Sequence, residues 1–69
     1  MSDIKAKFGQ SLKRVRESRG LSQEKLGEMI DLTEDSVGNM ERGKHWPRLK
    51  TLEKILKALK VKPKDLFNF

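Results

Sequence analysis

Between residues 22 and 43, apolar side chains recur every three or four positions in two short runs, a spacing typical of helices. The runs are Leu26, Met29 and Ile30, then Val37 and Met40, with Leu32 in the break between them. Thr33 stands where the second run needs an N-cap, and Gly43 follows its end, where a left-handed C-cap is favoured. The pattern predicts two short helices joined by a tight turn.

The shortness of the turn constrains how these two helices meet. Helices joined so tightly must cross steeply, and the second then forms a ridge that fits the DNA major groove. Gly27 agrees with this interpretation, because a position facing the partner helix has room only for a small side chain. We therefore interpret residues 22–41 as a helix-turn-helix unit.

The remainder of the chain has the same helical spacing. A first helix is predicted from about residue 4 to residue 19, where Gly20 ends it. After a loop that contains Pro47, a fourth helix is predicted over residues 49–60 and a short fifth helix over residues 63–67. No stretch alternates as a strand would. We expect an all-α fold, a compact five-helix domain over residues 1–69, with residues 1–3 disordered.

Composition narrows the range of functions. The chain has no cysteine and one histidine, and it lacks metal-spaced clusters and a glycine-rich phosphate cradle. We therefore expect no enzyme activity, no metal and no cofactor. No apolar run approaches the roughly 20 residues of a membrane span, and no signal-peptide core is present, which favours a cytoplasmic protein. The formal net charge of +6 favours a polyanionic partner.

A series of short motifs along the chain is similar to the Xre family. The motifs are LSQEKL, a tight turn with a Thr-led helix, ERGK, a Pro-containing loop, TLEKILKALKV and PKDLF. From about residue 8 to residue 67 the chain resembles these Cro/repressor-type helix-turn-helix regulators of phages and bacteria, which have the lambda-repressor-like fold. The resemblance implies a bacterial or phage-encoded regulator that binds double-stranded DNA sequence-specifically. It also implies a homodimer on a palindromic operator, with repression favoured over activation.

The resemblance assigns candidate DNA-binding residues by position. Gln23 opens the second helix, where free backbone N–H groups also suit a phosphate. Asn39 is favoured for a base contact, because its amide can pair with both N6 and N7 of adenine. The full set of candidates is Gln23, Thr33, Glu34, Asp35, Ser36 and Asn39 in the helix-turn-helix, with Lys44, His45 and Arg48 in the loop that follows.

Other positions have expected structural roles. Arg16 and Glu41 match a pair that forms an internal salt bridge in many family members, so we expect them to tie the first helix to the third. Trp46 is interpreted as packing across the junction of the third and fourth helices, with stacking on the DNA backbone as the alternative. Because one recognition helix reads few base pairs, a dimer is expected. We predict a two-fold contact made by the end of the fourth helix and the apolar C-terminal side chains Leu66, Phe67 and Phe69.

The predicted recognition segment departs from the family pattern in its charge. Residues 21–41 contain one basic and six acidic side chains, net −5, whereas residues 1–20 and 42–69 have net charges of +4 and +7. Glu34 and Asp35 either accept a hydrogen bond from cytosine N4 or mainly stabilise the helix N-terminus, by about 0.3–1 kcal/mol each. The acidity leaves a second function open, in which this face docks a basic protein partner such as a toxin. The basic flanks, Gln23 and Asn39 favour DNA.

Overall fold

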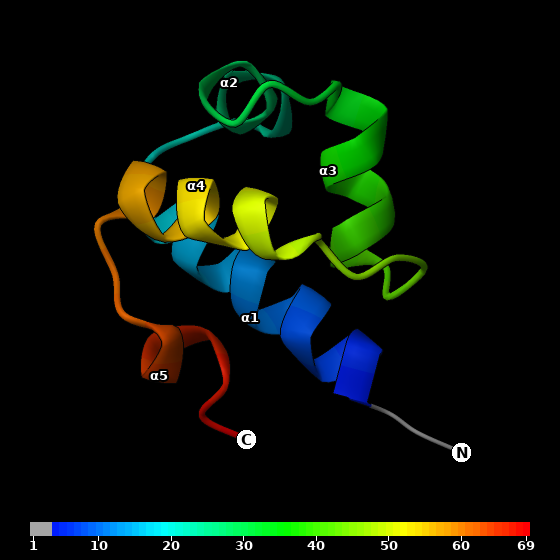
Figure 1. Cartoon of the computed structure of the whole chain (residues 1–69), viewed down its shortest axis with the longest axis vertical. Coiled ribbons are helices and arrows are strands. Elements are labelled where there is room, and N and C mark those ends of the chain that lie inside the picture. The colour runs from blue at the N-terminus through cyan, green and yellow to red at the C-terminus, as the bar shows by residue number, and fades with distance from the viewer. Residues whose placement is uncertain (1–3) are drawn as a thin grey trace.

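The computed structural model describes residues 4–69 and shows five helices in them without a strand (Figure 1). The helices are α1 (Ile4–Ser18), α2 (Gln23–Met29), α3 (Glu34–Glu41), α4 (Leu49–Leu59) and α5 (Pro63–Leu66). The predicted all-α, five-helix fold is confirmed, and α1, α4 and α5 each end one residue before the predicted position. The expectation of disorder at residues 1–3 lies outside the described residues.

Local chemistry sets the ends of the two central helices. The Ser22 hydroxyl accepts a hydrogen bond from the Lys25 N–H at 3.0 Å, and the Thr33 hydroxyl accepts one from the Ser36 N–H at 3.1 Å. Both contacts are N-caps that satisfy donors left free in a first helical turn. Gly43 has a φ of +78°, the left-handed conformation expected after α3. The chain therefore begins and ends α3 where the sequence predicts.

The helix-turn-helix geometry is visible in the view of Figure 1, where α2 is seen nearly end-on while α3 runs down the page. A Cβ atom on Gly27 would lie 2.7 Å from the Leu32 carbonyl oxygen and 3.1 Å from the Thr33 carbonyl carbon. The small residue is therefore required by the backbone of the turn and not, as expected, by the facing helix. Asp31 reverses the chain with a φ of 62°, a conformation that Asp tolerates better than most residues.

The core is built from one face of each helix, with α1 packed against α3 and α5, and α2 packed against α3 and α4. Its buried members are Phe8, Leu12, Val15, Leu26, Ile30, Val37, Met40, Ile55, Leu59 and Leu66. Three apolar positions at helical spacing fall outside it: Ile4 is 47% exposed, Met29 is 44% exposed and Leu49 is 74% exposed. Met29 is excluded because Leu26 and Ile30, four residues apart, share the buried side of α2.

An aromatic cluster joins the loop after α3 to the C-terminal segment. The Phe8 ring is fully buried, and its centroid lies 5.4 Å from the Trp46 ring and 5.2 Å from the Phe67 ring. Trp46 therefore packs against α1 and the segment after α5, and it also lines a groove with Met40 of α3 and Thr51 of α4, at the junction where its packing was expected. Leu66 has no exposed surface, so the prediction that its side chain takes part in a dimer contact is wrong. It belongs to the core of the single chain.

Candidate nucleic-acid interface

A buried network of hydrogen bonds, here called the polar node, holds α1, α2 and α3 together behind the outward face of α3. The Arg16 guanidinium donates from Nε and Nη2 to the two Glu41 carboxylate oxygens at 2.6 and 3.1 Å, and from Nη1 to the Leu21 carbonyl oxygen at 2.7 Å. The Arg16 and Glu41 side chains are only 7% and 3% exposed. The hydrogen bond to Glu41 raises the pKa of Arg16 above its ordinary value, against the opposing effect of burial. The expected ion pair is present and fixes α3 on α1.

Gln23 belongs to the same node, which its expected role at the DNA surface did not anticipate. Its Nε2 donates to the Glu41 carboxylate at 2.9 Å, and the side chain is half-buried. The amide keeps one N–H and its carbonyl oxygen for any further contact. Gln23 therefore fixes the start of α2 against the end of α3 and offers a single side-chain donor to DNA.

The outward face of α3 carries most of the candidates for base contacts. Glu34 and Asp35 are exposed, and Ser36 is half-buried with its hydroxyl 3.1 Å from that of Thr33. Asn39 is half-buried, and its Oδ1 accepts a hydrogen bond from Arg42 Nη2 at 2.7 Å. The Asn39 Oδ1 and Arg42 Nη2 atoms lie on the face of α3 that is turned away from the core.

Arg42 was not among the residues predicted for the site. Helical spacing alone could have found it, because positions 35, 39 and 42 are separated by four and three residues and so share one face of the helix. The guanidinium is exposed at the end of α3, next to Asn39. We therefore add Arg42 to the residues of the outward face.

Three of the six acids of residues 21–41 form ion pairs, and one of these pairs is buried. Glu41 is paired with Arg16, Asp31 with Lys54 at 3.0 Å, and Glu28 with Lys25 at 3.8 Å. The acids of residues 21–41 without an ion pair among the described residues are Glu24, Glu34 and Asp35. All three lie in the first turn of a helix, where a negative charge is favourable. The net charge of this segment therefore overstates the negative charge that faces DNA.

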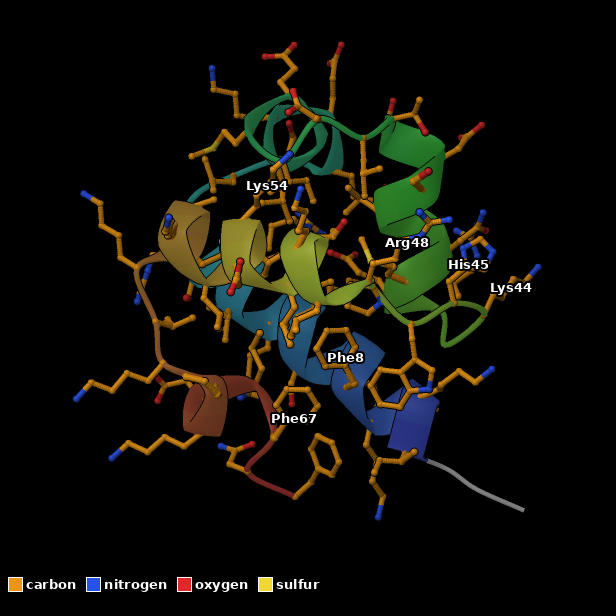
Figure 2. All side chains as sticks on the ribbon, viewed as in Figure 1. Phe8, Lys44, His45, Arg48, Lys54 and Phe67 are labelled. Atoms are coloured by element: carbon orange, nitrogen blue, oxygen red, sulfur yellow. The ribbon has the colours of Figure 1, made fainter. Side chains whose placement is uncertain are left out.

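Basic side chains collect at the opposite end of α3. Lys44, His45 and Arg48 are exposed, and Figure 2 shows them side by side along the lower half of α3 and the loop that follows it. A groove of about 450 Å³ runs between α3, this loop and the start of α4. Its lining combines basic, hydroxyl and apolar side chains: Leu32, Ser36, Met40, His45, Trp46, Pro47, Arg48 and Thr51.

The structure thus brings the predicted residues together on one side of the molecule. The charge of this side changes from negative to positive along α3. Acids mark the N-terminal end of α3, and cations mark its C-terminal end and the loop. A helix with exposed polar side chains, flanked by a basic loop, suits insertion in a major groove with the loop on the phosphates. The fold and this face are those of a helix-turn-helix DNA-binding protein.

Comparison with known proteins gives the family. The HTH_3 helix-turn-helix family model matches residues 12–66. The chain is 42% identical over 69 residues to the control protein C.BamHI of Bacillus amyloliquefaciens, covering 99% of this chain and 85% of the relative. It is 41% identical over 69 residues to the control protein C.MunI of a Mycoplasma species, covering 99% and 93%.

A solved structure gives the same result. The restriction-modification controller protein C.AhdI from Aeromonas hydrophila has a TM-score of 0.84 and 40% identity, over 90% of this chain and 94% of that one. The chain belongs to the Xre/Cro-type helix-turn-helix family. It is a DNA-binding transcription regulator and not an enzyme. No helix in residues 4–69 is long and apolar enough to cross a membrane.

Proposed function

We propose that this protein is a dimeric, operator-binding repressor that controls the genes of a restriction-modification system in the cytoplasm. The observation that carries the proposal is its similarity to controller proteins over most of both chains. The match covers 85% of C.BamHI, 93% of C.MunI and 94% of C.AhdI. By contrast, the match to the longer regulator PuuR of Escherichia coli covers 37% of that protein. The toxin partner that the acidic segment left open has no support among these relatives.

The DNA-binding part of the proposal follows from the face of α3. In the major groove, α3 would present Asp35, Asn39 and Arg42 to base edges. The N-caps Ser22 and Thr33 leave the first backbone N–H groups of α2 and α3 directed outward, where phosphates bind. The cations of the next loop, Lys44 and Arg48, would neutralise further phosphates and make binding salt-dependent, and the exposed His45 side chain lies between them in the sequence.

A dimer supplies the specificity that one short recognition helix lacks. Three exposed rings, here called the C-terminal aromatic surface, are those of Trp46, Phe67 and Phe69, at 42%, 36% and 47% exposure. The Phe67 centroid lies 6.4 Å from that of Trp46 and 6.1 Å from that of Phe69. This surface fits a two-fold contact, which needs a self-complementary patch. The end of α4 is less suited to it, because exposed Lys57 and Lys60 bring like charges together there.

Repression would follow from occupancy of the operator by the dimer. A dimer on a palindromic operator covers two half-sites about 10 base pairs apart, and an operator that overlaps a promoter then excludes the polymerase.

Chromatin immunoprecipitation in the native host tests the proposed role. We expect the strongest peak upstream of a gene for a restriction endonuclease or a DNA methyltransferase. The peak should disappear in a strain that carries Lys44→Ala and Arg48→Ala together, since two phosphate contacts are then lost. Strong peaks restricted to unrelated promoters would contradict the restriction-modification role.

A further inference from the structure

We propose that Arg42, held in place by Asn39, reads a guanine in the major groove. The inference rests on the DNA-binding function described above and adds to it a base-contacting residue, a positioning residue and the base that they select. It also replaces the expectation that Asn39 reads adenine.

Arg42 carries a charge that has no carboxylate partner in the fold. None of the carboxylates in residues 4–69 forms a salt bridge with this guanidinium. The neighbouring Glu41 points inward and is occupied by Arg16 and Gln23. The positive charge of Arg42 therefore has no ion-pair partner in residues 4–69 and remains at the surface of the recognition helix.

The Arg42 guanidinium is held close to the helix that carries it. A Cβ atom on Gly38, one turn earlier, would lie 3.1 Å from Arg42 Nη1 and 3.7 Å from its Cζ. The guanidinium therefore lies against the α3 backbone, in the space beside Gly38. The bond from Nη2 to Asn39 Oδ1, at 2.7 Å, holds it from the other side. An arginine side chain that is fixed in this way loses less conformational entropy on binding than an arginine side chain that moves freely in solvent.

The pair formed by Arg42 and Asn39 offers hydrogen-bond donors to a base. Arg42 has five N–H donors and uses one on Asn39, so about four remain, and Asn39 adds the N–H groups of its own amide. The Asn39 carbonyl oxygen, which would have to accept from adenine N6, already accepts from Arg42. Most of the groups that this pair leaves free are therefore N–H donors, and these are complementary to guanine, whose major-groove edge carries two acceptors, O6 and N7.

The experiment begins with an operator selected from random duplexes. Each base pair of one half-site is then replaced in turn, and affinities are measured by fluorescence anisotropy. For the wild-type protein, replacing one guanine should weaken binding by about 5- to 150-fold, the range for a bidentate arginine–guanine pair. With Arg42→Ala, affinity for the selected operator should fall by a similar factor, and the protein should then bind all four bases at that position equally.

Lys44→Ala is the matched control, because it also removes one exposed positive charge next to α3. It should weaken all the duplexes uniformly and leave the guanine preference intact. If Arg42→Ala behaves like Lys44→Ala, Arg42 binds only a phosphate and the inference is overturned. Failure to select any operator with the wild-type protein would instead overturn the DNA-recognition function, and with it this inference.

Two variants of Asn39 test its positioning role. Asn39→Asp keeps an acceptor for Arg42 and loses the amide donors, so it should retain the guanine preference while overall affinity falls. Asn39→Ala loses the acceptor and should relax discrimination at that same guanine. If either variant instead removed a preference for adenine at another position, Asn39 would be the base-reading residue and the proposed arrangement would be wrong.

Discussion

At the scale of single residues, the protein depends on a charged group that it has buried. Arg16 and Glu41 are far apart in the sequence, yet their side chains meet at 2.6 Å with almost no exposed surface. Buried ions persist only when every donor and acceptor has a partner, and Leu21 and Gln23 complete this set. Because the node touches three helices, it positions the whole of α3.

Removing one member of this node should destabilise the fold severely. Arg16→Met leaves the Glu41 carboxylate buried with only the Gln23 amide, and we expect a loss of about 3–5 kcal/mol in the free energy of unfolding. Urea denaturation followed by circular dichroism measures this loss.

Because the pKa of Arg16 is raised, its charge contributes fully to stability at all pH values below its unfolded pKa, and this contribution is lost only in strong alkali. The Arg16 contribution should therefore be constant across the neutral range.

The double variant Arg16→Met, Glu41→Leu is the control for this prediction. It removes both charges and fills the space with apolar atoms, so it should recover much of the lost stability. Equal losses in the single and double variants would mean that an unpaired buried carboxylate is not the cause.

At the scale of helices, the sequence was sufficient to predict the helix ends wherever these depend only on neighbouring residues. Ser22, Thr33 and Gly43 are found at helix ends as their side chains predict, because capping involves only neighbours in the chain. Asp31 and Lys60 were not predicted to adopt the left-handed conformation, which is rarely available to residues other than glycine. The side chain of Asp31 is bonded to Lys54, 23 residues away, and such a contact has no local signal.

The candidate site was likewise predictable where it depends on positions within one helix, and not where it depends on contacts between distant residues. The family resemblance placed Asp35 and Asn39 among the candidates, and helical spacing from these two positions would have included Arg42. The charge count could not show which acids are paired, since pairing joins distant residues. Trp46 shows the same limit, because its partners Phe8 and Phe67 come from the two ends of the chain.

At the scale of the whole molecule, one aromatic cluster joins the proposed dimer surface to the loop proposed to contact phosphates. Trp46 belongs to the loop that carries the cations expected on phosphates, and its ring stacks on Phe67, next to the C terminus. A partner subunit seated on the C-terminal aromatic surface would therefore also restrain that loop. In the proposed dimer, the subunit contact and the contact with the DNA backbone would be linked through this single side chain.

The proposed dimer surface can be tested at Phe69, its most peripheral residue. Phe69 contacts Phe67 but not the buried Phe8 ring, so Phe69→Ser should leave the fold intact. Losing this apolar contact in both subunits should raise the dimer dissociation constant by about tenfold or more, as measured by sedimentation velocity. Met29→Ser is the matched control, with 44% exposure against 47%, on α2 and away from the C terminus (Figure 1). Identical sedimentation of the Phe69 variant and the intact protein would exclude this surface.

The central claim is that two copies of this chain read a palindrome through α3. The most direct measurement is selection and sequencing of random duplexes bound at about 50 and 200 mM salt. We predict enrichment of one palindrome with half-sites about 10 base pairs apart, together with a steep loss of affinity at the higher salt. Weak binding without an enriched sequence at either salt would contradict this claim and would direct attention to a basic protein partner for the acidic start of α3.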